Sequence, residues 1–132
     1  MSAATSLANG DSGEYWRAAE AGRLVFQKCA ACGVVQFPPR HHCAACWQAD
    51  LHWIESSGQG RVETYTVVHR APLPDFRGRV PYVVATVTVA EGPRMIATLV
   101  GDSALEVRIG DAVTVDFEKD AAGRTLPVFR RD

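Results

Sequence analysis

The stretch KCAACGVVQFPPRHHCAAC, residues 28–46, decides the fold of this chain. It holds two Cys-x-x-Cys motifs, Cys29 with Cys32 and Cys43 with Cys46, and these are all the cysteines of the sequence. Two thiolates three residues apart can bind one tetrahedral ion, at metal–sulfur distances of about 2.3 Å, if the chain between them turns tightly. Gly33, directly after the first motif, suits such a turn. The spacing therefore predicts a zinc ribbon.

Two disulfides in a small secreted domain are the alternative for these cysteines. No apolar signal segment precedes the motifs, and no cysteine lies outside them, so a metal site is favoured. Four sulfur ligands leave no open position for an activated water, so the predicted zinc is structural. His41 or His42 could replace one sulfur, and iron could occupy the same four thiolates. Trp47, in place of a glycine after the second motif, speaks against an iron-based electron carrier.

Length and charge limit the class of protein. A chain of 132 residues is about one ordinary domain, or a small metal-stapled unit with one compact barrel. The 14 Lys and Arg residues nearly balance the 15 Asp and Glu residues, which implies no general attraction for polyanions. Nothing approaches the run of about 18 apolar residues that a membrane helix needs. We expect a soluble protein of the reducing cytoplasm.

The N-terminal part predicts a tail, one helix and the ribbon. Residues 1–13 lack an apolar period and predict a disordered tail. Residues 14–21 are good helix formers with Tyr15 and Trp16 on a shared face, and Gly22 follows as a stop signal. Residues 24–29 and 34–39 read as the strands of the ribbon, ended by two prolines. Residues 47–57 read as an apolar bridge, with Trp47 and Trp53 as internal struts between the ribbon and the rest.

A change of pattern at Gly58 and Gly60 marks the predicted domain boundary. The helix and ribbon would occupy residues 14–57, and a second domain residues 58–132. Five segments of the second domain are rich in Val, Thr, Ile or aromatic residues and are bounded by Gly, Pro or Asp: 61–70, 81–90, 94–100, 112–118 and 125–130. Five short strands of this kind predict a Greek-key barrel of the OB type, so the fold class is mainly β.

The order of these motifs resembles a known family. A Tyr-Trp helix precedes the ribbon, and Trp53, Gly58-x-Gly60, Pro81-Tyr82, Ile109-Gly110-Asp111 and Pro127-x-Phe129 follow it. This order is similar to that of the acyl-CoA-associated OB-fold family with an N-terminal rubredoxin-like zinc ribbon. The resemblance covers about residues 14–130. It implies an accessory subunit that binds a thiolase-superfamily enzyme, or a hydratase-like one, in a hetero-oligomer, and that could also contact the acyl-CoA.

The residues themselves provide no complete catalytic set. With every cysteine assigned to metal, no thiol is free to act as a nucleophile. His69 is the best general-base candidate, but only Asp75 lies near it in sequence, and adjacency alone does not supply a partner within hydrogen-bond reach. A half-exposed strand position is the interpretation we favour for His69. The Gly58-x-Gly60 motif is too short for a nucleotide fingerprint.

Three segments combine the residue types that a CoA arm or a partner protein would need. A CoA arm requires basic groups for its phosphates and an aromatic or apolar surface for its adenine. The helix aromatics could anchor a partner, or they could pack on the protein's own ribbon and barrel. The candidate residues are Tyr15 and Trp16 on the helix, Phe37, Arg40 and His41 in the ribbon loop, and Phe76, Arg77, Arg79 and Tyr82 between the first two barrel strands.

The alternative function is a single-stranded nucleic-acid-binding module, because zinc ribbons and OB barrels recur in such proteins. That function needs a basic strand face with aromatic residues. The central strand PYVVATVTVA carries no positive charge and one aromatic residue, Tyr82. Nucleic acid is therefore the less favoured ligand.

Overall fold

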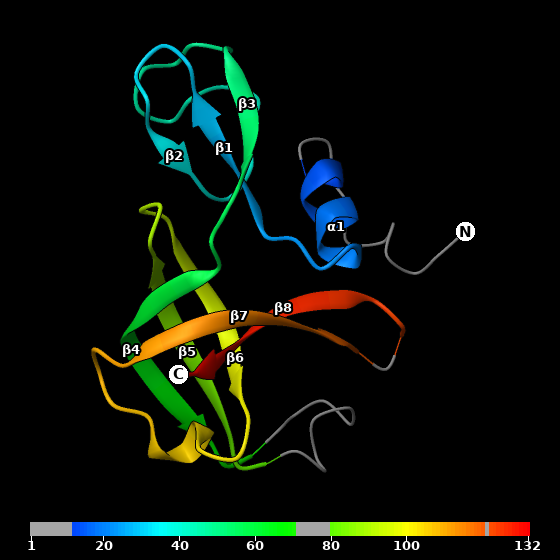
Figure 1. Cartoon of the computed structure of the whole chain (residues 1–132), viewed down its shortest axis with the longest axis vertical. Helices are drawn as coiled ribbons and strands as arrows, with labels where there is room; N and C mark the ends of the chain where they lie inside the picture. The colour runs from blue at the N-terminus through cyan, green and yellow to red at the C-terminus, as the bar shows by residue number, and fades with distance from the viewer. Residues whose placement is uncertain (1–11, 71–79, 121) are drawn as a thin grey trace.

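A computed structural model describes residues 12–70, 80–120 and 122–132 of the chain. These residues form a three-stranded sheet, in the order β2-β1-β3, and a closed barrel, in the order β4-β5-β6-β8-β7 (Figure 1). The prediction of a mainly β fold with one short helix, a four-cysteine ribbon and a five-stranded OB-like barrel is confirmed. In chain order the elements are α1 (Gly13–Glu20), β1 (Val25–Cys29), β2 (Val35–Gln36), β3 (Leu51–Glu55), β4 (Gln59–Val68), β5 (Tyr82–Val89), β6 (Arg94–Val100), the 3-10 helix η3 (Ala104–Glu106), β7 (Ala112–Lys119) and β8 (Thr125–Arg131).

Helix α1 lies one residue earlier than the sequence predicted, and it packs against β8 and β1. The buried residues of the helix are Tyr15, Ala18 and Ala19. Gly22, two residues after the end of the helix, has a left-handed φ of 78°, and its N–H donates to the Ala19 carbonyl at 2.9 Å. Glycine adopts this conformation without a steric penalty, so the predicted stop signal works as expected.

The ribbon is built on β1, which pairs antiparallel with β2 and along its whole length with β3. Strand β3, with Leu51 opposite Cys29, lies within residues 47–57, which the sequence predicted as an apolar bridge without a strand. Its partner lies about 25 residues earlier in the chain, and single-sequence periodicity over a short segment does not reveal such a pairing. Strand β2 is shorter than predicted, because Pro38 and Pro39 have no backbone N–H to donate.

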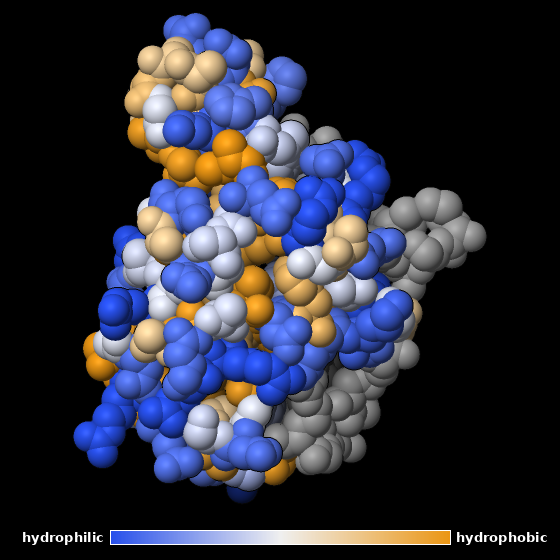
Figure 2. Space-filling model, in the orientation of Figure 1, coloured by the Kyte–Doolittle hydropathy of each residue, from blue (hydrophilic) through white to orange (hydrophobic). Residues whose placement is uncertain are grey.

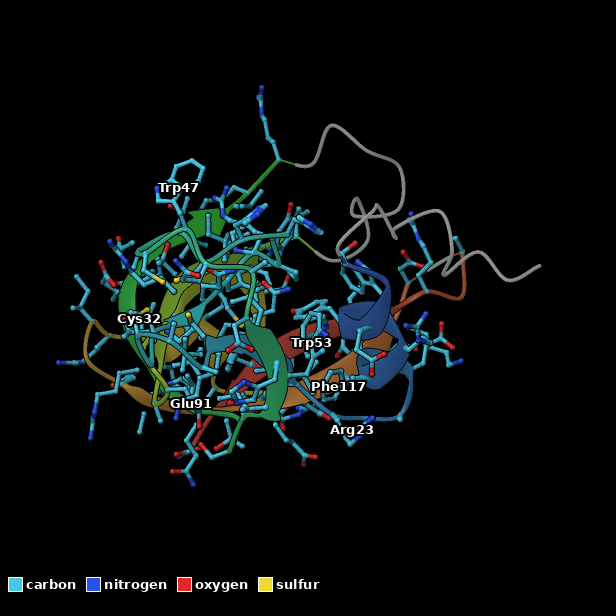
Figure 3. The ribbon with its side chains drawn as sticks, turned by 90° about the horizontal axis from the view of Figure 1, so that it is seen from above. Arg23, Cys32, Trp47, Trp53, Glu91 and Phe117 are labelled. Atoms are coloured by element: carbon cyan, nitrogen blue, oxygen red, sulfur yellow. The ribbon has the colours of Figure 1, made fainter. Side chains whose placement is uncertain are left out.

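The two tryptophans of the predicted bridge have opposite environments. Trp53, on β3, is partly buried and packs against the hydrophobic core. Trp47 is 78% exposed, so the prediction that it is an internal strut was wrong. Trp47 follows Cys46 in a turn with φ of 67°, and this turn directs its side chain away from the molecule (Figure 3).

Each of the five predicted barrel strands is present, with ends shifted by at most two residues. Along β5 the burial alternates strictly, and the inward side chains are Val83, Ala85, Val87 and Val89. The alternation arises because successive side chains of a strand point to opposite faces. The barrel closes where β6 meets β8 in parallel, through the pairs Leu99 with Phe129 and Val100 with Arg130.

One hydrophobic core joins the barrel to the ribbon and to α1. Leu24, Phe26 and Tyr15 are buried in the same cluster as the inward residues of β5, and Trp53 and Phe117 pack against it. Figure 2 shows apolar residues gathered where the ribbon meets the barrel. Among the described residues, no helix has the length and apolar character required to cross a membrane.

A second link between the two regions is polar. Ser56 and Ser57 lie between β3 and β4, and Glu91 lies in the turn between β5 and β6. The Ser56 hydroxyl donates to one Glu91 carboxylate oxygen, and the Ser57 N–H donates to the other at 3.0 Å. Gly58 follows with φ of 79°, and a β-carbon there would lie 2.4 Å from Cγ1 of Val115. The short segment between ribbon and barrel is therefore constrained by hydrogen bonds to Glu91 and by close packing against Val115.

Candidate metal centre

Four cysteine sulfurs converge at the end of the ribbon. The Sγ atoms of Cys29, Cys32, Cys43 and Cys46 all lie within 4.8 Å of one another. Cys29 Sγ is 3.6 Å from Cys46 Sγ, and Cys32 Sγ is 3.5 Å from Cys43 Sγ. A tetrahedron with metal–sulfur bonds of about 2.3 Å has edges of about 3.8 Å, whereas a disulfide needs about 2.05 Å. All four are free thiols, so their arrangement fits a tetrahedral ion.

Two similar turns aim the sulfurs at one point. The N–H of Gly33 donates to the Cys29 carbonyl at 2.8 Å, and the N–H of Trp47 donates to the Cys43 carbonyl at 2.9 Å. In the second turn the Ala45 N–H also points at Cys43 Sγ, at 3.4 Å. Each Cys-x-x-Cys segment is therefore folded back on itself by its own backbone, as a metal-binding turn requires.

The thiols do not ionise alike. Backbone N–H groups of Cys46 and then Ala45 lower the pKa of Cys43 to about 6. A backbone N–H of Gln48 acts in the same direction on Cys46, but burial and the three neighbouring thiols raise its pKa to about 12. Four negative sulfurs at these distances repel one another. The cluster therefore needs a cation to hold four thiolates at neutral pH, which again fits a metal ion.

Two buried glutamines hold the loop that carries the second pair of cysteines. Gln27 on β1 accepts a hydrogen bond from the Arg40 N–H at 2.8 Å and donates to the Arg40 carbonyl at 2.9 Å. Gln36 on β2 donates to Gln27 at 2.8 Å and accepts from the Ala44 N–H at 2.9 Å. Sequence reasoning missed this network. The available signal was a glutamine inside each of two apolar strand segments.

The histidines considered as ligands are not part of the cluster. His41 and His42 are exposed and contact each other, with ring centroids 4.8 Å apart. Within the described part of the chain, the group able to hold a metal consists of the four cysteines. His69 is exposed just after the end of β4, and Asp75 lies outside the described residues.

The other candidate residues divide into three sets. Tyr15, Trp16 and Phe37 pack within the protein: Tyr15 has its ring centroid 5.0 Å from that of Trp16 and 5.3 Å from that of Phe37. Tyr15 is 3% exposed, so the internal packing left open by the sequence is the outcome for its side chain. Arg40 and His41 are exposed, and Tyr82 is half-buried at the start of β5. Phe76, Arg77 and Arg79 lie outside the described residues.

Comparison with known proteins identifies the family. The model of the ChsH2 rubredoxin-like zinc ribbon domain matches residues 16–52, and that of the ChsH2 C-terminal OB-fold domain matches residues 53–118. The chain belongs to the ChsH2 zinc-ribbon and OB-fold family. The resemblance recognised in the sequence is thereby confirmed.

Two relatives of the family show how its members are named. A probable enoyl-CoA hydratase alpha subunit of Thermomonospora curvata is 40% identical over 122 residues, which are 92% of this chain and 38% of that protein. A DUF35 domain-containing scaffold protein of Methanocaldococcus jannaschii is 38% identical over 97 residues, 73% of this chain and 68% of that protein. The chain thus spans less than half the length of the hydratase subunit.

A solved structure covers nearly the whole chain. It is named an Ltp2-ChsH2(DUF35) aldolase, and it matches with a TM-score of 0.84 and 39% identity. The match covers 95% of this chain and 97% of the other. Ribbon and barrel are therefore combined in both proteins in the same way.

Proposed function

We propose that this chain is a non-catalytic accessory subunit that docks on a thiolase-superfamily or hydratase-like enzyme and supports that enzyme's reaction on an acyl-CoA. The observation that carries the proposal is the near-complete match to a chain of the Ltp2-ChsH2(DUF35) aldolase, whose name joins two components. The other relatives are named as an alpha subunit and as a scaffold, which are also roles in an assembly.

The chemistry of the described residues supports a non-catalytic role. Four sulfur ligands complete a tetrahedral sphere, so a metal held there keeps no position for substrate or water. Several barrel carboxylates are engaged by neighbouring donors: Arg130 beside Asp116 and the Thr88 hydroxyl beside Glu63 hold the pKa values of these carboxyls below their usual range. A general acid at neutral pH needs the opposite shift.

Zinc is the ion we propose for the four cysteines. It accepts tetrahedral sulfur ligation without a redox change, and its binding free energy would stabilise a small sheet directly. Iron would fit the same four sulfurs. Metal analysis of the purified protein, together with its visible absorption, distinguishes the two ions, because an iron–thiolate site is coloured.

We propose that the ribbon loop, which carries Arg40 and His41, is the part of the chain that would contact coenzyme A. Arg40 and His41 are both exposed there and could meet phosphate groups. The cavity of about 360 Å³ beside Tyr82 is less suited, because Asp102 and Glu118 also line it. Carboxylates at that position would repel the phosphates of the ligand.

The test is to recover the tagged chain gently from its native host, identify the proteins that come with it in fixed proportion, and measure bound zinc. We expect one zinc per chain and an acyl-CoA enzyme of the thiolase superfamily or a hydratase-like enzyme. Recovery of nucleic acid, or of well-folded zinc protein with no enzyme, would contradict the accessory role and favour the binding-module alternative.

A further inference from the structure

The two metal-binding turns are alike in backbone and unlike in one side chain. In each turn the residue after the second cysteine has a left-handed backbone, with φ of 79° at Gly33 and 67° at Trp47. In each turn the first cysteine also donates its N–H onward, Cys29 to the Val34 carbonyl at 2.9 Å and Cys43 to the Gln48 carbonyl at 2.8 Å. Trp47 therefore stands at the position that glycine fills in the other turn.

A left-handed backbone is unfavourable for tryptophan. Its β-carbon crowds the following carbonyl when φ is positive, a penalty that glycine avoids. Among the described residues, Trp47 is the one non-glycine residue with positive φ. Residues in such conformations gather at functional sites, where the strain is retained for a purpose other than stability.

Burial does not compensate for this strain. Trp47 is 78% exposed, the highest value among the exposed large hydrophobic side chains of the described residues. If the Trp47 ring packed over the cysteine sulfurs, contact with them would bury it. Instead, the side chain projects away from the ribbon (Figure 3). The residue therefore contributes little to the packing of its own chain.

The two turns themselves expose small, apolar or uncharged side chains, and the exposed residues Arg40, His41, His42, Gln48 and Asp50 lie next to them in sequence. The exposed residues of the two turns are Ala30, Ala31, Cys32, Gly33, Val34, Ala44, Ala45 and Trp47. We call these eight residues the ribbon tip. A single-stranded nucleic acid that stacked on Trp47 would need cations beside it for its phosphates, and the ribbon tip supplies none. An uncharged surface with one protruding tryptophan fits an apolar pocket on another protein, since tryptophan is enriched among the residues that dominate interface energies.

We infer that Trp47 is the anchor by which the ribbon tip docks into an apolar pocket of the enzyme subunit. This inference rests on the proposed function and adds the surface that makes the contact. Binding would bury the exposed ring without cost to the ribbon, because the strained backbone is already in place before the enzyme arrives.

The decisive variant is Trp47→Gly, because it removes the anchor and relieves the backbone strain together. The probe is the acyl-CoA enzyme that is recovered with the wild-type chain, purified and titrated at known concentrations. We expect the dissociation constant to rise at least about tenfold, while the variant keeps its zinc and melts at the same or a higher temperature. Trp47→Phe retains an aromatic ring and should bind with an intermediate affinity.

Leu105→Ser is the matched control. Leu105 is 54% exposed on η3, at the end of the barrel away from the ribbon (Figure 1). This variant should bind the enzyme like the wild type. A photo-crosslinking residue at position 47 should form a covalent adduct with the enzyme, and the same residue at position 105 should not.

Wild-type affinity in Trp47→Gly would overturn the inference. So would a loss of affinity accompanied by loss of zinc or a lower melting temperature, because Trp47 would then act through the fold of its own chain. Crosslinks from position 47 to a second copy of this chain would also overturn it. If no such enzyme accompanies the wild-type chain, the proposed function fails first and the inference fails with it.

Discussion

The ribbon and the barrel are folded by different forces. The barrel buries a contiguous set of large apolar side chains, among them Val62, Val87, Met95, Val113 and Phe129, inside a closed ring of strands. The distal part of the ribbon has a two-residue strand, exposed turns, and a buried interior made of Cys29, Cys43, Gln27 and Gln36. We propose that the hydrophobic effect is the main force that holds the barrel, whereas the distal ribbon depends on a bound metal and on its polar network.

Removing one metal ligand should have the largest effect on the ribbon and the smallest on the barrel. Cys43→Ser should abolish metal binding and unfold the ribbon, because structural zinc contributes roughly 10–16 kcal/mol of apparent binding free energy in small zinc domains. We propose that residues 58–132 fold as a unit, so the barrel signals should persist in the NMR spectrum while those of the ribbon collapse. His41→Ala, a neighbouring non-ligand, should keep its zinc. Stoichiometric zinc in an ordered Cys43→Ser variant would show that the ligand set is wrong.

A methyl group at the junction should have the next largest effect. In Gly58→Ala the new β-carbon would lie 2.4 Å from Val115 Cγ1, at a backbone φ of 79°. Overpacking and positive φ together should lower the free energy of unfolding by about 3 kcal/mol in urea denaturation. Gly123→Ala shares the positive φ, 83°, but has open space around it, so it should lose only about 1 kcal/mol. Equal losses in the two variants would mean that the contact with Val115 does not constrain the junction.

Inside the ribbon, the polar network can be weakened without touching a ligand. Gln36→Met keeps the size of the side chain but removes the acceptor of the Ala44 N–H and one of the two hydrogen bonds to the side-chain oxygen of Gln27, which keeps the Arg40 N–H. Unsatisfied buried groups cost about 1–3 kcal/mol each, so the second metal-binding turn should loosen. We expect faster transfer of zinc to a chelator, followed with a colorimetric indicator. Gln48→Met, at an exposed position, should transfer its zinc at the wild-type rate.

Much of the fold follows from local sequence signals. The cysteine spacing determines the ribbon, because two ligand pairs on tight turns have few other uses in one chain. Strict alternation along Tyr82–Val89 and the glycines that separate the strands determine the barrel. Strand β3 was not predicted, because its evidence lies in the pairing with β1 and not in its own residues.

The environment of individual side chains was harder to predict. Trp47 and Trp53 have the same chemistry, and a rule based on residue type buries both. Only the left-handed turn after Cys46 sets Trp47 outward. Gln27 and Gln36 look like solvent-facing strand residues until β1, β2 and the loop at Arg40 are brought together. The convergence of the four cysteines could be predicted because it depends on their spacing, whereas the environment of these residues depends on tertiary structure.

The smallest expected effect concerns the polar link between ribbon and barrel. Burial raises the pKa of Glu91, but hydrogen bonds from the Ser56 hydroxyl and the Ser57 N–H outweigh it, so the pKa of this carboxyl is lowered in the native protein. A lowered native pKa stabilises the fold at neutral pH, and this contribution is lost as the pH falls through the lowered value. Glu91→Gln should therefore cost less than about 1 kcal/mol at pH 7, since the group is partly exposed and solvent screens its charge.

The difference in stability between Glu91→Gln and the wild type should shrink in acid when both are melted in parallel, with Glu20→Gln as the control for loss of one surface charge. A difference that stays constant down to acid pH would mean that the carboxylate charge does not hold the ribbon to the barrel, and that the hydrophobic contact through Trp53 and Phe117 suffices.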